Sequence, residues 1–354
     1  MAVKKFGIIG CGMISTFHAR AIRELGAELV ACYDQLPIAS ERVAKEFGCK
    51  AYGDLKDFLA DPEVEIVTIG TPSGAHLDPA VAAARAGKHV IVEKPLEITP
   101  ARCDEIIKAC EESGVTLSTV FPSRFHQSSV QLKKAIESGR FGKLTLGDAI
   151  VKWYRTQQYY DSGVWRGTWK LDGGGALMNQ AIHSVDLLNW LMGDVAEVTA
   201  LTGLVAHENI EVEDVAVAAL RFKNGALGLL EATTAAYPGY LKRIETHGST
   251  GSAVIEEEDI IKWDFVESRE EDAAIRESMT NRLSGGGGAA DPAAIGHQAH
   301  AKQFADVLAA INEGAQAAYR RVRRAQERRS DLRRVRVGEE GRSREVGIGY
   351  CAFA

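Results

Sequence analysis

A histidine on a polar helix face is the clearest candidate for acid–base chemistry in this chain of 354 residues. His183 follows a segment with three glycines, and Asn179 and Asp186 stand four residues before it and three residues after it. At this spacing the three side chains share one face of an α-helix. A histidine there can take a proton from an alcohol, since the unperturbed pKa of histidine is close to neutral pH. The alternative is a core histidine bonded to a neighbour.

A lysine at the end of a predicted strand is the second candidate. Lys94 stands between Glu93 and Pro95, directly after an apolar run at residues 90–92. The carboxyl ends of the strands in an open parallel sheet line the ligand crevice. A lysine at that edge can stabilise negative charge on a reacting oxygen. Taken alone, a Lys-Pro pair is more typical of a turn, and the histidine motif favours the functional interpretation.

A glycine-rich turn near the start of the chain predicts a dinucleotide site. The first predicted strand runs into the sequence Gly10-Cys11-Gly12-Met13-Ile14-Ser15. This is a Gly-x-Gly-x-x-Gly pattern with serine in the third place, and a predicted helix follows it. There Gly10 makes the tight turn, Gly12 lets the backbone approach a pyrophosphate, and the helix start supplies N–H groups. The alternative is an ordinary glycine turn.

An acid at the end of the second predicted strand adds to this pattern. Asp34 follows Gly12 by 22 residues, and a carboxylate at that place accepts hydrogen bonds from an adenosine ribose. The same carboxylate repels a 2′-phosphate, and no arginine follows it directly. We therefore expect NAD as the cofactor in preference to NADP. The alternative is that Asp34 only stabilises a turn.

The elements that must position these residues form two patterns. Residues 4–121 alternate short β-rich runs with amphipathic helical stretches, which predicts a parallel sheet. From residue 130 onward strands dominate, and Asn224-Gly225 between apolar runs is a strong hairpin signal. We predict an α/β protein with an N-terminal Rossmann domain, a doubly wound parallel sheet, at residues 1–122. A C-terminal α+β domain with a large mixed or antiparallel sheet is predicted at 123–314 and includes a last helix at 295–311.

Composition and charge exclude several classes of protein. Hydrophobic residues make up 45% of the chain and charged residues 25%, which is typical of a globular protein. No stretch approaches the roughly 18 uninterrupted apolar residues of a membrane span. The six cysteines form no Cys-x-x-Cys pair, so neither disulfides nor a metal site is expected. A reducing, cytoplasmic setting fits this cysteine usage.

With these residues identified, the chain resembles the Gfo/Idh/MocA family, the group of glucose-fructose oxidoreductase and inositol dehydrogenase. The resemblance covers about residues 4–313. The segments that carry it are the Gly-Cys-Gly start, Thr71-Pro72-Ser73-Gly74-Ala75-His76, Glu93-Lys94-Pro95, Trp165-Arg166-Gly167-Thr168-Trp169 and the three-glycine segment leading to His183. It implies an NAD(P)-dependent oxidoreductase acting on a sugar, a cyclitol or a derivative, with its active site between two domains.

The resemblance also implies roles for individual residues. By position it implies cofactor contacts from Gly10, Cys11, Gly12, Met13, Ile14, Asp34, Thr71, Pro72, His76, Glu93, Lys94, Trp165 and Arg166. It implies that His183 is the acid/base and that Lys94 assists it. We expect His183 to remove the hydroxyl proton and Lys94 to stabilise the alkoxide while a hydride passes to the nicotinamide. Many family members have aspartate at the place of Asn179, and an amide cannot accept that proton.

An aromatic loop at residues 154–169 has two interpretations. Aromatic rings beside polar groups suit the apolar faces and polar edges of a sugar, but such residues are also enriched in protein interfaces. Both interpretations stay open for Tyr159 and Tyr160. The predicted substrate contacts are Lys94, Tyr159, Asn179 and His183.

The last part of the chain departs from the pattern. Residues 315–354 hold eleven arginines and five acids, so they contribute +6 to the net charge of −6 and the remainder carries −12. No helical or strand period is present there. One interpretation is a basic, disordered arm that binds nucleic acid or an acidic surface. The other, which we favour, is a shifted reading frame in a G+C-rich gene, because this segment contradicts an otherwise consistent fold.

Three functions therefore compete. The first is a dehydrogenase or reductase acting on a CH–OH group, and the second is a sensor that binds NAD(H) without turnover. The presence of both Lys94 and His183 favours the enzyme. The third, nucleic-acid binding through the tail, is opposed by the acidity of the remaining chain. We expect a small-molecule substrate, no membrane contact, and a homodimer or homotetramer, because an exposed sheet needs cover.

Overall fold

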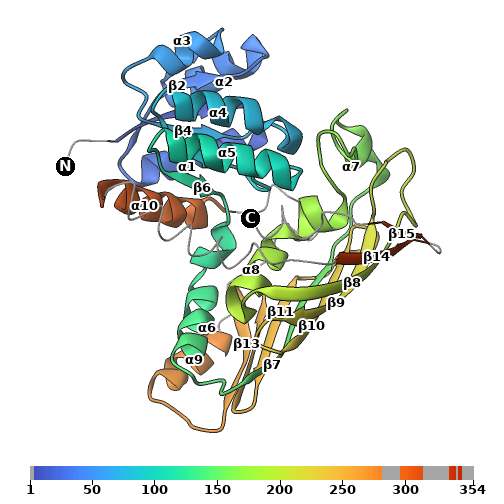
Figure 1. Ribbon diagram of the computed structural model, residues 1–354. Helices are drawn as coiled ribbons and strands as arrows, with labels where there is room; N and C mark the ends of the chain where they lie inside the picture. The colour runs from blue at the N-terminus through green and yellow to red at the C-terminus, as the bar shows by residue number, and fades with distance from the viewer. Residues whose placement is uncertain (1–3, 281–295, 314–334, 340–341, 345–354) are drawn as a thin grey trace. The chain divides into compact units, whose positions relative to one another are not determined.

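The computed structural model describes residues 4–280, 296–313, 335–339 and 342–344, which fall into two compact units. The first unit contains residues 4–122 and one helix from late in the chain. The second contains residues 123–280 and two short strands near the C-terminus. Each unit is built on a single sheet (Figure 1).

The first unit is a Rossmann fold with a six-stranded parallel sheet of order β3-β2-β1-β4-β5-β6. Its strands are β1 (Lys5–Ile9), β2 (Glu28–Tyr33), β3 (Lys50–Tyr52), β4 (Ile66–Ile69), β5 (His89–Val92) and β6 (Leu117–Thr119). Its helices are α1 (Met13–Glu24), α2 (Pro37–Phe47), α3 (Leu55–Ala60), α4 (Leu77–Arg85), α5 (Pro100–Glu112) and the short η1 (Ser73–Ala75). Every residue of β4 is buried, as expected of a strand covered on both faces. The predicted doubly wound sheet is confirmed.

Helix α10 (Gln298–Asn312) belongs to the first unit, whereas we predicted it in the second domain. It packs against α1, and Phe304 stacks on Phe6 of β1 with ring centroids 6.1 Å apart. Ala301 and Val307 enter the same buried core. The predicted assignment followed chain order, but the apolar face of this helix is buried by the first strand of the chain.

The second unit is built on a mixed sheet of order β13-β12-β11-β7-β10-β9-β8, extended at the β8 edge by β14 and β15. Its strands are β7 (Leu144–Lys152), β8 (Val195–Gly203), β9 (Val215–Phe222), β10 (Leu227–Thr233), β11 (Arg243–Gly248), β12 (Gly251–Glu256), β13 (Asp259–Phe265), β14 (Val335–Glu339) and β15 (Arg342–Arg344). Only β10 with β7 and β14 with β8 are parallel among these described strands. The predicted mixed sheet is confirmed.

Helices cover one face of this sheet. They are α6 (Gln127–Glu137), α8 (Ile182–Met192) and α9 (Glu271–Thr280). The unit also contains the short helix α7 (Gln157–Asp161) and the short helical segments η2 (Pro122–Phe125) and η3 (Ala176–Ala181). Helix α8 contacts β7 and β11 (Figure 1). The predicted hairpin joins β9 to β10 through Asn224 and Gly225, whose φ of +89° requires glycine.

The segment before His183 differs from its prediction. We expected one α-helix from about residue 176 to residue 192, but η3 is a π-helix and the α-helix begins only at Ile182. Gly175 starts this turn, and a Cβ there would lie 1.7 Å from the carbonyl oxygen of Glu213. The close approach of a neighbouring chain segment shapes this turn, and local helical periodicity cannot reveal such a contact.

Most of the predicted tail lies outside the described residues. We expected no regular element in it, but its described backbone forms β14, parallel to β8, and β15, antiparallel to β14. The choice between an arm and a shifted frame stays a prediction. Within the described ranges, no helix is both long enough and apolar enough to cross a membrane.

Candidate functional site

The glycine turn between β1 and α1 has room for a ligand. Gly10 has a φ of +89°, and a Cβ there would lie 2.7 Å from the backbone of Gly70 and Thr71, so only glycine fits. Apart from Gly12 and its two chain neighbours, no described residue has an atom within 4 Å of the place that a Cβ of Gly12 would take. Gly12 precedes α1, which has no side-chain cap. The N–H groups of the first turn can therefore bind an anion such as a pyrophosphate.

The side chains of the glycine turn point in different directions. Cys11 is 1% exposed and lies in the core, so it can offer a ligand only its backbone. Met13 is 57% exposed. Ile14 is half-buried near Gly70. The ligand surface of this turn is thus mainly backbone, as the glycine pattern predicts.

Asp34 lies at the end of β2 beside this turn. Its Oδ2 accepts a hydrogen bond from Cys11 N at 2.7 Å, and its Oδ1 accepts one from Leu36 N at 2.8 Å. Arg42 of α2 donates to Cys11 O at 2.6 Å. A carboxylate beside a glycine turn can also accept hydrogen bonds from a ribose. Sequence reasoning missed Arg42, because no motif marks a residue in the middle of α2.

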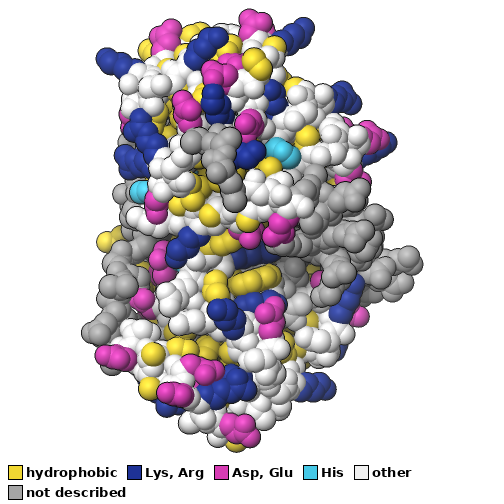
Figure 2. All heavy atoms as spheres, turned by 90° about the vertical axis from the view of Figure 1, so that its left-hand side faces the viewer, with side chains coloured by type: hydrophobic (Ala, Val, Ile, Leu, Met, Phe, Trp, Pro, Cys, Tyr) yellow, Lys and Arg dark blue, Asp and Glu magenta, His cyan; other side chains and the backbone are white. Residues whose placement is uncertain are grey.

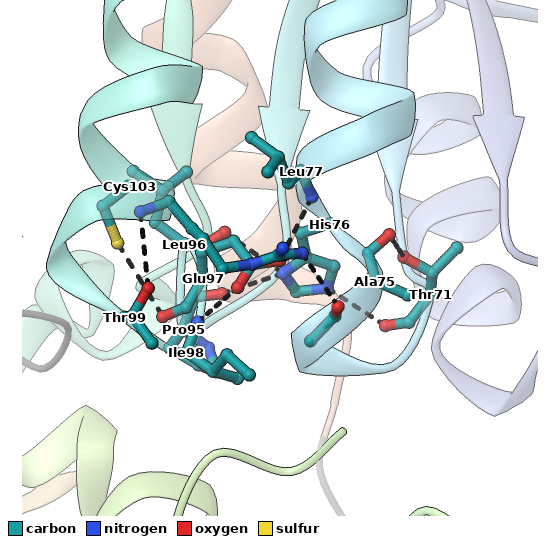
Figure 3. A network of polar contacts seen from close by, with 12 residues as sticks. Thr71, Ala75, His76, Leu77, Pro95, Leu96, Glu97, Ile98, Thr99 and Cys103 are labelled. Carbon is teal, nitrogen blue, oxygen red and sulfur yellow. Dashed lines mark hydrogen bonds and ion pairs between the residues drawn. The ribbon is translucent and has the colours of Figure 1, made fainter. Parts of the chain in front are cut away.

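His76 connects the loops that follow β4 and β5 (Figure 3). Its Nδ1 lies 2.9 Å from Pro95 O, and its Nε2 lies 3.0 Å from Thr71 O. The ring is 1% exposed, and burial lowers the pKa of His76 although these backbone contacts oppose that change. We expected His76 to line the cofactor cleft, and its contacts are to the backbone of both loops instead. Pro72 is half-buried in the first of these loops.

Glu97, labelled in Figure 3, and Arg102 join the same two loops. Glu97 Oε1 accepts hydrogen bonds from Leu77 N at 3.2 Å and from Arg102 at 2.8 Å, and its Oε2 accepts one from Ile98 N at 2.6 Å. Arg102 also donates to Gly74 O at 3.1 Å. This pair could not be predicted from the sequence, because neither residue belongs to one of the motifs described above.

Glu93 is buried beside the backbone of Lys94. Its Oε1 lies 2.9 Å from His18 Nε2, and its Oε2 accepts a hydrogen bond from Lys94 N at 3.1 Å. Burial alone would raise the pKa of Glu93, but the His18 hydrogen bond and the charges of His18, His300 and Lys94 lower it to about 2. Ligand-type atoms of His18, Glu93 and His300 lie within 4.8 Å of one another. The Lys94 side chain itself is half-buried.

His183 lies in the first turn of α8 and is half-buried. Asp186, one turn later, is buried and forms a two-point ion pair with Arg124, whose Nε donates to Oδ2 at 2.7 Å and whose second nitrogen donates to Oδ1. Asp186 is therefore held by a structural partner. The polar face predicted from helical spacing is not uniform, because the segment preceding His183 is π-helical.

The amide of Asn179 in η3 is fixed by two neighbours. Its Nδ2 donates to Asp172 Oδ1, and its Oδ1 accepts from Gln180 Nε2 at 2.7 Å. Asp172 is buried, and its Oδ2 accepts from Gly167 N at 2.9 Å. A carboxylate therefore lies one hydrogen bond from Asn179. No sequence motif singles out Asp172, because its contacts to Gly167 and Asn179 form only in the folded chain.

Tyr159 is brought together with Asn179 through Gln180. Gln180 Nε2 also donates to Tyr159 Oη at 3.0 Å, and Arg155 donates to Gln180 Oε1 at 2.9 Å. Arg155 is 3% exposed, and its carbonyl oxygen lies 2.8 Å from His207 Nε2. Tyr159, Asn179 and Gln180 thus form one connected polar group.

Tyr160 has a structural environment. Its hydroxyl lies 2.8 Å from Thr234 Oγ1, and its ring packs edge-on against His207 at 4.7 Å between centroids. Burial raises the pKa of Tyr160 to about 12. Tyr160 is therefore a core residue, whereas the half-buried Tyr159 is the tyrosine that could contact a ligand.

Trp165 and Arg166 lie against Tyr159. The guanidinium of Arg166 is 4.2 Å from the ring centroid of Tyr159 and 4.6 Å from that of Trp165. Its Nε is buried and has no hydrogen-bond partner among the described residues. A buried N–H without a partner costs about 1–3 kcal/mol. Arg166 is therefore suited to donate to an acceptor on a ligand.

Glu213 supports the three-glycine segment from a distant strand edge. Its carboxylate accepts hydrogen bonds from Gly175 N at 2.9 Å and Leu177 N at 3.0 Å. Burial raises the pKa of Glu213, and these backbone bonds oppose that change. No local signal could have identified Glu213, because it lies 38 residues after Gly175.

Comparison with known proteins gives matches across both units. A family model described as an oxidoreductase family with an NAD-binding Rossmann fold matches residues 4–121, and a GFO/IDH/MocA C-terminal domain model matches residues 129–254. Myo-inositol 2-dehydrogenase of Thermotoga maritima is 31% identical over 264 residues, which cover 70% of this chain and 73% of that protein. The WlbA dehydrogenase of Bordetella pertussis, crystallised with NADH and UDP-GlcNAcA, is 35% identical with a TM-score of 0.79, covering 90% of this chain and 92% of that one.

Proposed function

The chain belongs to the GFO/IDH/MocA family of NAD-dependent oxidoreductases that act on CH–OH groups, and on this premise we propose that His183 and Lys94 carry its reaction. The substrate is a sugar, a cyclitol or a derivative of one. The single observation that carries the proposal is that the chain has both groups, a lysine directly after β5 and a histidine at the start of α8.

The first unit offers a setting that fits NAD. The open space at Gly12 and the uncapped start of α1 suit a pyrophosphate, and Asp34 suits the ribose. Thr71, Pro72 and the Glu93-Lys94 pair follow β4 and β5, and we assign them to the nicotinamide end. We also assign Trp165 and Arg166 to that end, and the buried Nε of Arg166 supports an acceptor there.

In the proposed mechanism His183 takes the proton of the substrate hydroxyl as the C–H bond breaks. Lys94 stabilises the negative charge that develops on the same oxygen. Bound NAD supplies the acceptor for the hydride. Asn179 and Tyr159 bind neighbouring hydroxyls, and the Gln180 amide between them fixes their orientation. Because Asn179 cannot accept a proton, the proton leaves through His183.

The main competing function is a sensor that binds NAD(H) without turnover. Such a protein would need the cofactor site but not an acid/base. The polar group around Gln180, held by buried Arg155, favours an enzyme, since ordered hydrogen-bonding groups beside an acid/base suit a reacting substrate.

An absorbance assay of reduced nicotinamide tests the proposal. The full chain is mixed with NAD, and separately with NADP, and with a panel of inositols, glucosides, uronic acids and nucleotide-linked sugar acids. We expect reduced nicotinamide to form with one class and with NAD in preference. Measurable NADH binding without turnover across the panel would contradict the enzyme and support the sensor.

For the substrate class we propose to test UDP-linked sugar acids first. The relative crystallised with UDP-GlcNAcA is similar over 90% of this chain at 35% identity, whereas the inositol dehydrogenase of Thermotoga maritima matches over 70% at 31%. Turnover with inositol alone would favour the second class. His183→Ala and Lys94→Met variants assign the chemistry whichever substrate is found.

The free face of the second sheet supports self-association. Along β10, residues alternate between buried and exposed, and several of the outward residues there and on other strands of the sheet are large and apolar. These exposed side chains are Leu146, Leu201, Val217, Leu227 and Leu229. We propose that this face is covered in a homodimer or homotetramer of a cytoplasmic enzyme. Sedimentation of the purified protein as a monomer would contradict the assembly.

Nucleic-acid binding has less support. Figure 2 shows Lys and Arg mixed with Asp and Glu over the face it presents, without a broad band of positive charge among the described residues. A nucleic-acid surface normally gathers positive charge on one face. Substrate turnover and cofactor binding are therefore the first properties to measure.

A further inference from the structure

Three side chains connect two loops that emerge at the same edge of the parallel sheet. Figure 3 shows two of them, His76 and Glu97. One loop follows β4 and begins at Thr71, and the other follows β5 and contains Lys94. His76 reaches from the first loop to Pro95 O, and Glu97 reaches from the second loop to Leu77 N. We call His76, Glu97 and Arg102 the loop clamp.

The loop clamp contains an ion pair with one buried partner. Glu97 is 0% exposed, and the Arg102 side chain is 34% exposed. Glu97 uses both oxygens, one toward Leu77 N and Arg102 and the other toward Ile98 N. A buried ion pair often contributes little net stability compared with an apolar pair of similar volume. In this fold the ion pair holds the two loops in one relative position through directional hydrogen bonds, which an apolar pair could not form.

The backbone of Lys94 is held on both sides. On its N-terminal side, Lys94 N donates to Glu93 Oε2, and Glu93 is held by His18. On its C-terminal side, the carbonyl oxygen of Pro95 lies 2.9 Å from His76 Nδ1. The Lys94 side chain thus starts from a backbone with little freedom to move.

We propose that Glu97, together with Arg102 and His76, is a positioning residue that sets the place of the Lys94 ammonium relative to the loop after β4. The inference depends on the role of Lys94 given under the proposed function. Neutralising Glu97 would release Arg102 and weaken the contact to Leu77, so the two loops would separate. Displacement of a reacting group by about 1 Å can lower turnover about a hundredfold.

A double-mutant cycle tests the loop clamp. The full chain is compared with Glu97→Gln, Lys94→Met and the variant carrying both, and turnover is measured with the substrate found in the panel. We expect Glu97→Gln to lower kcat about ten- to hundredfold, with NADH affinity changed less than about threefold. In the Lys94→Met background the Glu97→Gln substitution should lower kcat almost no further, because the ammonium group that Glu97 positions is absent.

Control variants distinguish a specific effect on the position of Lys94 from a general loss of structure. Lys108→Met removes an exposed partner of Glu112 on the same helix, α5, and should leave kcat unchanged. If Glu97→Gln fails to fold, Arg102→Met carries the same test, because the backbone donors to Glu97 remain. An equal loss of kcat in both backgrounds would overturn the inference in favour of a structural role.

The outcomes also distinguish this inference from the proposed function. Normal kcat in Lys94→Met overturns the role of Lys94 and, with it, the positioning role of the loop clamp. A large loss in Lys94→Met with normal kcat in Glu97→Gln overturns the positioning role alone. A large loss in both single variants without further loss in the double variant supports both.

Discussion

Replacement of Glu93 by glutamine is expected to remove a part of the stability that depends on pH. The pKa of Glu93 falls from an ordinary 4.5 to about 2, because the hydrogen bond and charges of His18, His300 and Lys94 outweigh burial. The folded protein therefore binds this proton more weakly than the unfolded chain does. The resulting stabilisation is full above the ordinary value and is lost as the pH falls toward about 2.

The size of the effect follows from the shift. The pKa of Glu93 in the folded protein lies roughly 2.5 below its ordinary value, and this difference corresponds to about 3 kcal/mol of folding stability at about 1.4 kcal/mol per pH unit. Solvent screening does not reduce this value much, because Glu93 is 7% exposed. Glutamine keeps the size of the side chain but cannot carry the charge.

Urea unfolding at a series of pH values measures the stability that the Glu93 carboxylate contributes. We expect the free energy of unfolding of the Glu93→Gln variant to lie about 3 kcal/mol below that of the unmodified chain near neutral pH, and the gap to shrink to roughly 1 kcal/mol near pH 3. Glu112→Gln, at an exposed ion pair, should give a small gap at every pH. A Glu93→Gln gap that stays constant from neutral pH to acid would refute the reasoning.

Three further predictions concern single positions. His183→Ala should lower kcat about a hundredfold or more without changing NADH affinity in a fluorescence titration; an unchanged kcat would exclude it as the acid/base. Asp34→Ser should lower the preference for NAD over NADP about tenfold, read from the ratio of kcat/KM values, because the charge that repels a 2′-phosphate is removed. Gly175→Ala places a Cβ 1.7 Å from Glu213 O and should lower the free energy of unfolding by about 1–3 kcal/mol; a stability equal to that of the unmodified chain would show that the turn adapts.

Much of the fold could be predicted because its signals are local. The alternation of strands and helices, the glycine turn and the Asn224-Gly225 hairpin each depend on neighbouring residues. Helix α10 could not be placed, because its apolar face is complementary to Phe6 and the core of the first unit across almost the whole chain. The π-helix before His183 was also hidden, since Glu213 on another segment helps to shape it.

In the candidate site, too, some residues could be predicted from local motifs and others could not. Motifs selected Lys94, Asp34 and His183, whose roles remain predictions. Their supporting residues have no motif. Glu97 and Asp172 were found only from hydrogen bonds made in three dimensions. Residue types indicate where chemistry can occur, and tertiary contacts decide which groups are held still enough to perform it.

The place of α10 in the first unit has a consequence for biosynthesis. Phe304, which stacks on Phe6, leaves the ribosome 298 residues after it. At about 5–20 residues per second, this delay is roughly 15–60 s. During that time the first sheet lacks one of its covering helices, while residues 123–280 of the second unit are made. The apolar surface around Phe6 therefore stays uncovered by α10, and open to chaperones, until residues 298–312 have been made.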